Sequence, residues 1–179
     1  MPHILPDILS LIQYKKEVEC QFEEKNRPEQ CECCGKLKPW RHGDYTRKAG
    51  RTDEDMSLNP IHIQRYYCSA CKRTMSVLPE CVPPRRWHLW KVQQTAMLLF
   101  LLGSSARTVE KEVKASRHTI KRWVAWLLAQ FNVHKDALCT HFPSFGLFTE
   151  PVSFWSHVFD KLLFSTAMRL CHVTGVTIP

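Results

Sequence analysis

The stretch "CECCGKLKPWRHGDY", residues 31–45, places three cysteines within four positions and follows them with a glycine. Cys31 and Cys34 form a C-x-x-C pair, and "CSAC" supplies a second pair, Cys68 and Cys71. Four thiolates from two such pairs complete a tetrahedral structural zinc site with no open position. Gly35 suits the sharp turn that each pair requires. The pattern therefore predicts one structural zinc ion.

Other interpretations of the two pairs remain open at this point. They are a coincidence in a cysteine-rich chain, a redox dithiol or an iron–sulfur cluster. Zinc is favoured because no βαβ pattern surrounds the pairs, and residues 35–67 between them fit a β-hairpin with a long tip loop. Cys33 is interpreted as a spare thiol, and His42 as a structural or surface histidine that could replace a ligand. The remaining cysteines are interpreted as small buried hydrophobic residues: Cys20, Cys81, Cys139 and Cys171.

Around the cysteines, the pattern predicts short strands, and helices flank them on both sides. Strands are expected in "WRHGDYTRK", "IHIQRYYC" and "RTMSVL", with Ile61, Ile63, Arg65 and Tyr67 on one side of the second. A short helix is expected within residues 1–30, with a face made by Ile8, Leu11, Ile12 and Val18. After a proline-rich connector (residues 79–88), we expect four helices. They are residues 90–102, ended by Gly103, residues 106–113, capped by Ser104 or Ser105, residues 117 to about 131, capped by Ser116, and about 152–172.

The second and third of these helices have the pattern of a helix-turn-helix. Apolar residues fall where the helices would touch, with Ala115 at the turn: Val109, Val113, Ile120, Trp123, Val124, Leu127, Leu128 and Phe131. The opposite face of the third helix carries basic residues. In a recognition helix, Arg117 and His118 would contact base edges, and Lys121 and Arg122 would contact phosphates.

The net charge of +8 is concentrated in this region. Residues 85–122 hold nine Lys and Arg against two Asp and Glu, which gives +7. Such a concentration indicates a polyanionic partner, and the candidate contacts to double-stranded DNA are Arg85, Arg86, Arg107, Ser116, Arg117, His118, Thr119, Lys121 and Arg122. An amphipathic helix pair with a solvated basic face, or a helix lying on a membrane, would also be basic.

Three segments resemble the zinc ribbon at the front of bacterial insertion-sequence transposases and of the small proteins encoded with them. The matching residues are Cys31, Cys34 and Gly35, then His42, Gly43, Tyr45 and Arg47, then Arg65, Cys68, Cys71, Thr74, Ser76, Leu78 and Pro79. The resemblance covers residues 31 to about 131 and implies a helix-turn-helix after the ribbon and a role at mobile-element DNA. Glu110 and Lys114 depart from it, because such turns usually have Ala and Gly there.

The resemblance also directs attention to catalysis. A full transposase has an RNase H-like domain with three carboxylates that hold two metal ions. Beyond Phe131, only Asp136, Glu150 and Asp160 are available. We therefore expect a transposase-associated or truncated transposase protein that recognises DNA and has no catalytic residues. The alternatives are a transcriptional regulator, a metal-dependent strand-transfer enzyme that uses those three carboxylates, and a zinc-stabilised protein-interaction module.

The predicted fold class is α+β, a small β zinc ribbon followed by an all-α helix-turn-helix bundle. The predicted segments are an N-terminal helical segment (1–30), the ribbon (31–84), the helix-turn-helix domain (85–134) and an apolar helical segment (135–179). We expect the last segment to pack on the third helix or to form a dimer interface.

The expected partners are double-stranded DNA and a second subunit, which is either a copy of the chain or a separate transposase. "MPHILPDILS" lacks the pattern of a signal peptide, and the longest apolar run, residues 96–102, is too short to span a bilayer. We therefore expect a cytoplasmic, nucleoid-associated bacterial protein.

Overall fold

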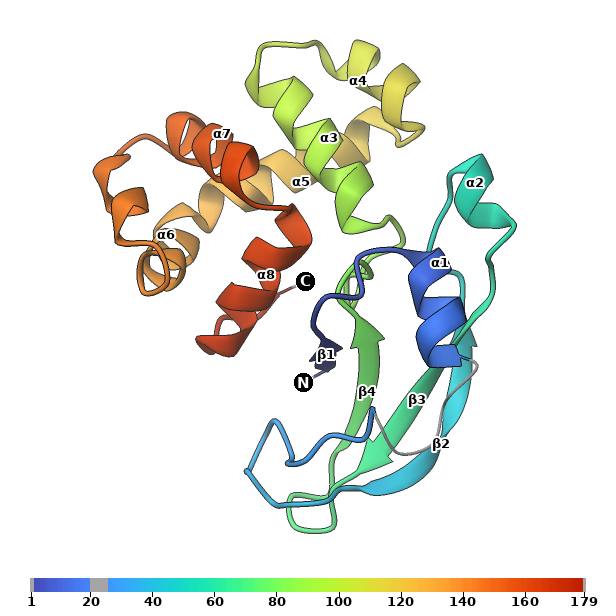
Figure 1. Ribbon diagram of the computed structural model, residues 1–179. Coiled ribbons are helices and arrows are strands. Elements are labelled where there is room, and N and C mark those ends of the chain that lie inside the picture. The colour runs from blue at the N-terminus through green and yellow to red at the C-terminus, as the bar shows by residue number, and fades with distance from the viewer. Residues whose placement is uncertain (1, 20–25, 179) are drawn as a thin grey trace. The chain divides into compact units, whose positions relative to one another are not determined.

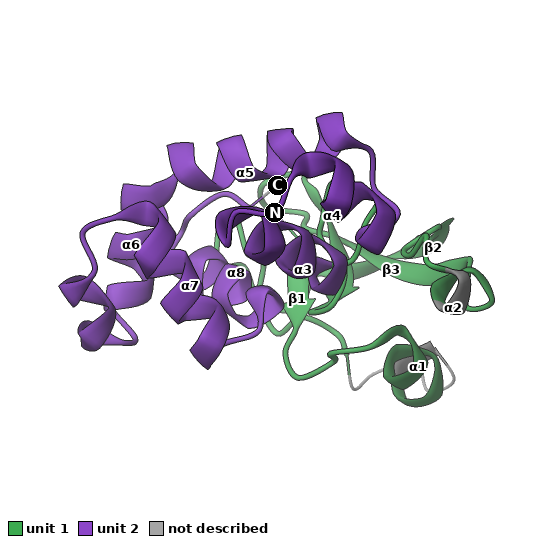
Figure 2. Cartoon of the chain, turned by 90° about the horizontal axis from the view of Figure 1, so that it is seen from above, with its two compact units in different colours: residues 1–89 green, residues 90–179 purple. Residues whose placement is uncertain are grey.

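The computed structural model describes residues 2–19 and 26–178. The chain divides into two compact units, Met1–Leu89 and Trp90–Pro179, which are coloured separately in Figure 2 and described here one at a time. Among the described residues, the first unit contains every strand, and the second contains only helices. The α+β class predicted from the sequence is confirmed.

The first unit is built on a four-stranded sheet (Figure 1). Its strands are β1 (His3–Leu5), β2 (Trp40–Arg47), β3 (Ile61–Tyr67) and β4 (Thr74–Pro79), arranged in the order β1-β4-β3-β2. The β2–β3 and β3–β4 pairs are antiparallel, as in a meander, whereas β1 is parallel to β4. The register of β2 shifts between Arg41 and Asp44, where Gly43 adopts a φ of +86°. A glycine is favoured at such a bulge because a side chain is strained at positive φ.

Burial along β3 changes from one face of the sheet to the other. Ile61 and Ile63 are buried on one face, as the alternation predicts, but Gln64 and Tyr66 are buried on the opposite face. The Tyr66 hydroxyl donates a hydrogen bond to Gln64 Oε1 at 2.9 Å, which pairs these two buried oxygen atoms. The face of β3 that carries Ile61, Ile63 and Arg65 is therefore buried only in the first half of the strand.

The N-terminal segment differs from its prediction. It contains α1 (Leu11–Tyr14), which Ser10 caps and which continues into a π-helical turn, η1 (Lys15–Glu19). Ile8 precedes the helix and Ile12 is 55% exposed, so the expected apolar face is not formed. Leu11 and Tyr14 make the buried contacts instead, and the Tyr14 hydroxyl donates to the His62 carbonyl at 2.6 Å. The side chain of Val18 and all of Cys20 lie outside the residues described.

The loop between β2 and β3 is folded on itself. It contains α2 (Asp53–Met56), whose first turn is capped by Thr52. The Asn59 side chain closes the loop, because it accepts a hydrogen bond from the Ala49 N–H at 2.8 Å and donates one to the Gly50 carbonyl at 2.7 Å. The backbone on either side of Arg51 is therefore fixed by local hydrogen bonds.

The second unit begins with the three helices that the sequence predicts. They are α3 (Trp90–Leu101), α4 (Ala106–Val113) and α5 (Arg117–Ala129). Ser105 caps α4 by accepting from the Thr108 N–H, and Ser116 caps α5 by accepting from the Thr119 N–H. The third helix is shorter than expected, because Phe131 already belongs to α6 (Phe131–Cys139). Residues 134 and 135, the predicted end of one segment and start of the next, both lie inside α6.

The C-terminal part contains two helices where one was expected. After η2 (Pro143–Leu147), α7 (Pro151–Lys161) ends at two extended residues, Leu162 and Leu163, and α8 (Phe164–Val173) follows. The N–H of Phe164 donates to the Gln94 side chain of α3 at 2.8 Å. The break also lets the rings of Phe159 and Phe164 pack edge to face, with centroids 5.4 Å apart.

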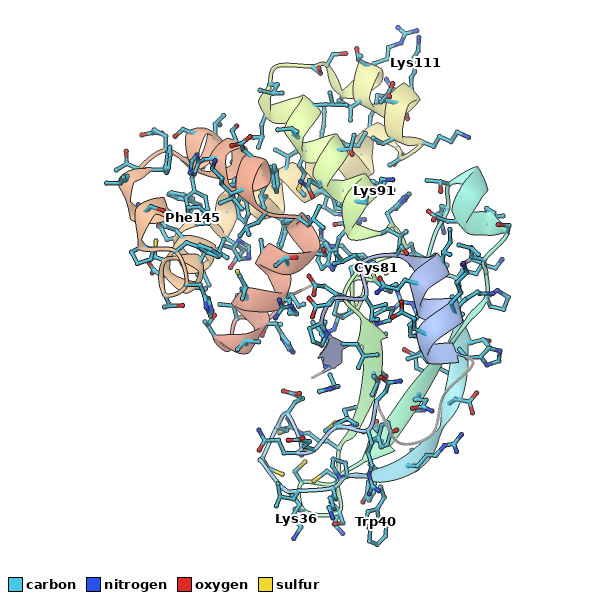
Figure 3. The ribbon with its side chains drawn as sticks, in the orientation of Figure 1. Lys36, Trp40, Cys81, Lys91, Lys111 and Phe145 are labelled. Carbon is cyan, nitrogen blue, oxygen red and sulfur yellow. The ribbon has the colours of Figure 1, made fainter. Side chains whose placement is uncertain are left out.

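The core of the second unit is aromatic. Trp155 is fully buried, and the rings of Phe154, Phe159 and Phe164 lie within 5.9 Å of it, centroid to centroid. Phe145 of η2, labelled in Figure 3, packs on Phe154 at 6.1 Å. Helix α7 packs on α3 and η2, and α8 packs on both α3 and α6. The expectation that this segment packs on the third helix stays a prediction, and Phe131, where that helix was expected to end, does contact the segment, because its ring lies 5.3 Å from that of Phe154.

Candidate metal centre and nucleic-acid interface

Two turns of the same construction carry the cysteine pairs. In the first, the Cys31 N–H donates to the Lys36 carbonyl at 2.8 Å, and Gly35 follows Cys34 with a φ of +71°. In the second, the Cys68 N–H donates to the Arg73 carbonyl at 2.9 Å, and Lys72 follows Cys71 with a φ of +58°. The chain thus forms the same tight turn twice, once with glycine and once with lysine in the left-handed position.

The two turns bring four sulfur atoms together. The Sγ atoms of Cys31 and Cys71 are 3.7 Å apart, those of Cys34 and Cys68 are 3.6 Å apart, and all four lie within 4.8 Å of one another. A tetrahedral ion with metal–sulfur bonds of about 2.3 Å places its sulfur ligands about 3.8 Å apart. All four cysteines are free thiols, so the cluster fits one structural metal ion.

The surroundings shift the pKa values of the clustered thiols in opposite directions. Cys31 and Cys68 are buried, whereas Cys34 is exposed and Cys71 half-buried. Backbone N–H groups, chiefly that of Cys71, lower the pKa of Cys68 to about 6. Burial has the opposite effect at Cys71, whose pKa it raises to about 12, and a bound cation would displace that proton. The Cys33 N–H also points at Cys31 Sγ, 3.5 Å away.

The other candidate ligands stay outside the cluster. Cys33 is exposed, and its sulfur lies 3.3 Å from Arg73 Nη1. His42 is exposed on β2, with its ring 5.6 Å from that of Tyr67. Among the isolated cysteines, Cys81 and Cys171 are buried as predicted, but Cys139 is only half-buried. Within residues 2–19 and 26–178, the four cysteines are the only close group of three or more His, Cys, Asp and Glu side chains.

The interior of the α4–α5 pair agrees with the predicted apolar positions, except that Leu128 is exposed and Phe131 belongs to α6. The buried residues of the pair are Val109, Val113, Ala115, Ile120, Trp123, Val124 and Leu127. Leu128 is 36% exposed. The turn between the helices is made by Lys114, a non-glycine residue with a φ of +52° and a ψ of 32°.

The opposite side of the pair is open to solvent. Arg107 on α4 and the first turns of α5 present exposed side chains: Ser116, Arg117, His118, Lys121 and Arg122. Thr119 is half-buried, and its hydroxyl lies 2.9 Å from that of Ser116. Glu110 contacts this surface, because its carboxylate accepts a hydrogen bond from the Arg117 N–H at 3.2 Å. The structure thus groups seven of the nine candidate DNA contacts on the α4–α5 pair.

The other two candidates belong to the first unit. Arg85 and Arg86 line a groove together with Thr46, Arg47, Lys48, Pro84 and Trp87. Arg85 and Arg86 were predicted from the sequence as DNA contacts within the connector, but Lys48 and Trp87 were not. The cluster "RRW" beside a basic strand end was the available signal, but its pairing with β2 depends on a tertiary contact. Burial, and then the nearby Arg51, lower the pKa of His88, which favours the neutral imidazole.

The three carboxylates considered for catalysis are all exposed. Asp136 lies on α6, Glu150 precedes α7, and Asp160 pairs with Lys161 at 3.4 Å. They are not part of a close ligand group in the described part of the chain.

The fold and the cluster define a class: a small sheet unit with a four-cysteine centre that fits one metal ion, followed by a helical unit. Residues 31–123, more than half of the chain, match the family described as a domain of unknown function (DUF6431), and the chain belongs to that family. The match begins at the first cysteine of the cluster and ends inside α5. No curated protein and no solved structure matches the chain.

Within residues 2–19 and 26–178, every helix is too short or too polar to cross a bilayer.

Proposed function

We propose that this protein binds double-stranded DNA in a sequence-specific manner, with α4 and α5 as the helix-turn-helix and one structural zinc ion in the cysteine cluster. One observation carries the proposal. The start of α5 exposes Arg117, His118, Lys121 and Arg122, while its other face is buried against α4. A recognition helix needs this division, because one face enters the major groove and the other holds the helix in place.

The geometry of α5 supports a particular distribution of roles. Arg117 and His118 follow the Ser116 cap, and the N-terminal residues of a recognition helix meet base edges. Arginine can donate two hydrogen bonds to guanine O6 and N7. Lys121 and Arg122 lie one turn further along, where phosphates of the same groove would be reached. Arg107 extends the basic surface onto α4.

Zinc is the metal that this cluster suits best. Four thiolates with tetrahedral spacing match a closed zinc site, and they leave no position for a substrate or an activated water. Iron–sulfur clusters also take four cysteines, but the sulfurs here are spaced for one ion. The role of the metal is then to hold the two cysteine turns, and with them the ends of β2 and β3, in register.

The biological setting that we propose is a mobile element. This rests on the resemblance of residues 31 to about 131 to the ribbon and helix-turn-helix of insertion-sequence transposases. On this proposal, the protein recognises the ends of an element, alone or with a separate transposase subunit. A transcriptional regulator would use the same surface at a promoter, so the location of the bound site separates the two roles.

The experiment is binding-site selection from random duplexes with the purified full-length chain. The selected sequence is then compared with the DNA around the gene. A match at terminal repeats supports the mobile-element role, and a match only at the promoter supports regulation. Recovery of no preferred sequence would contradict sequence-specific recognition.

Variants locate the binding surface. Arg117→Ala with Lys121→Ala should weaken binding of the selected duplex at least tenfold, because one base contact and one phosphate contact are lost. Lys16→Ala with Lys161→Ala removes the same charge from exposed positions outside α4 and α5 and should change affinity much less. Six phosphate contacts would give a log–log salt slope of about −5. Equal losses in both double variants would contradict the assignment, and unchanged binding in both would favour a protein-interaction module.

A further inference from the structure

A basic groove lies within the first unit. It has a volume of about 530 Å³ and is formed by the end of β2 and the connector after β4. Its lining residues are Thr46, Arg47, Lys48, Pro84, Arg85, Arg86 and Trp87. Four of the seven are cationic, and none is acidic.

The Arg47 side chain joins the two sides of the groove by hydrogen bonds. This half-buried side chain donates hydrogen bonds to three carbonyls of the connector: Pro83 at 3.2 Å, Pro84 at 3.2 Å and Arg86 at 2.9 Å. These bonds fix the connector against the end of β2, and they use main-chain acceptors. The position of the connector backbone therefore does not depend on which side chains follow at positions 85–87.

The walls of the groove combine positive charge with an aromatic ring. Lys48 and Arg85 are exposed. The ring of Trp87 is 60% exposed, and the Arg51 guanidinium lies 4.8 Å from its centroid. An exposed tryptophan ring leaves apolar surface in contact with water, which is unfavourable unless a ligand covers it. Arg51 packs on one face of the Trp87 ring.

This combination fits one kind of ligand. Proteins that bind single strands pair a positively charged groove with aromatic rings on which unpaired bases stack. Duplex DNA offers phosphates to such a groove but no base face, because its bases are stacked on one another. We infer that this groove binds a single-stranded segment of nucleic acid, with a base on Trp87 and phosphates at Lys48 and Arg85. This activity is separate from duplex recognition by α5 and does not rest on it.

Fluorescence anisotropy of the zinc-loaded full-length chain with labelled oligo(dT) of about 12 nucleotides tests the inference. Oligo(rU) of the same length shows whether DNA or RNA binds better. Trp87→Ala should weaken binding about 5- to 150-fold, the range that removal of one stacked base gives. Trp87→Phe should retain part of the affinity, and Lys48→Ala with Arg85→Ala should weaken binding and flatten its salt dependence.

Trp40→Ala is the matched control. Trp40 is 65% exposed but lies at the other end of β2, because it pairs with Tyr67 whereas Arg47 pairs with Ile61. Figure 3 labels Trp40 and Lys36 at the end of the sheet that carries the cysteine turns. Trp40→Ala should bind oligo(dT) like the unmodified chain. Arg117→Ala with Lys121→Ala should lose the duplex and keep the single strand, so failure of the two functions can be told apart.

Two results would overturn the inference. One is unchanged oligo(dT) affinity in Trp87→Ala and in Lys48→Ala with Arg85→Ala. The other is an equal loss of duplex and single-strand binding in these variants, which would make the groove part of a duplex interface. Zinc content and thermal unfolding of each variant show whether the first unit is folded. If Trp87→Ala does not fold, Lys48→Ala with Arg85→Ala provides the test, because both side chains are exposed.

Discussion

Glu110 holds Arg117 at two points. Its Oε1 accepts a hydrogen bond from the Arg117 backbone N–H at 3.2 Å, and its Oε2 lies 3.1 Å from Arg117 Nε. The first contact satisfies an N–H at the start of α5 that has no partner within the helix. The second orients the side chain that we assign to base recognition. Glu110 therefore joins α4 to α5 and places a negative charge beside the proposed DNA surface.

Glu110→Gln should increase affinity for the selected duplex by about two- to fivefold, because it removes a competing ion pair of about 0.5–1 kcal/mol. Glutamine can still accept from the Arg117 N–H, so stability should change little. Glu110→Ala loses this acceptor and should lower the free energy of unfolding by about 1 kcal/mol. Anisotropy and urea denaturation measure the two effects. Weaker binding by Glu110→Gln would mean that the carboxylate positions Arg117 productively.

Lys114 makes the turn of the helix pair at a φ of +52°, where an L residue is strained by about 1–2 kcal/mol. Lys114→Gly should therefore raise the free energy of unfolding, by up to about 1 kcal/mol after the added freedom of the unfolded chain is subtracted. Lys111→Gly is the control, because this exposed residue lies within α4 and the change should cost about 1 kcal/mol. Both variants lose one positive charge, so opposite signs in urea denaturation would isolate the backbone effect. Equal losses would contradict it.

Local patterns were sufficient to predict much of this architecture. Each cysteine turn needs only six consecutive residues, so Cys31 and Cys68 could be paired with their partners from spacing alone. The starts of α4 and α5 depend on Ser105 and Ser116, whose hydroxyls bond three residues ahead. Where contacts between residues close together in the sequence determine a structure, that structure can be predicted from the sequence.

Features set by distant contacts were missed. Strand β1 has three residues and pairs with Val77 and its neighbours more than 70 positions away. The break between α7 and α8 occurs at Leu162 and Leu163, without glycine or proline, and is accompanied by a bond from the Phe164 N–H to Gln94. The groove at Trp87 likewise depends on Arg47, which is near it only in the folded chain. The partners of these contacts lie too far apart in the chain for any short stretch of sequence to contain both.

Cys68→Ser should abolish or strongly reduce bound zinc, because Cys68 is fully buried and is one of the four clustered thiols. Cys33→Ser is the matched control and should keep about one zinc per chain, since its sulfur lies outside the cluster. Elemental analysis of the purified variants measures this. Removing zinc with a chelator should also expose residues 31–84 to protease while the helices from Trp90 onward persist, because the metal contributes folding free energy to the first unit. An unmodified chain without metal, or equal zinc loss in both variants, would contradict the assignment.

Thiol alkylation tests the packing of both units at once. Burial raises the pKa of Cys81 and of Cys171 to about 12, and iodoacetamide reacts with the thiolate. Because these pKa values are raised, the thiolate fraction at pH 9 is only about 0.1%, so changing the pH from 7 to 9 should leave both residues unlabelled in the native protein. Exposed Cys33 should react over the same period, and denaturant should make all three react. Peptide mass spectrometry over time gives the rates, and native labelling of Cys81 at the rate of Cys33 would show that the end of β4 is not packed as described.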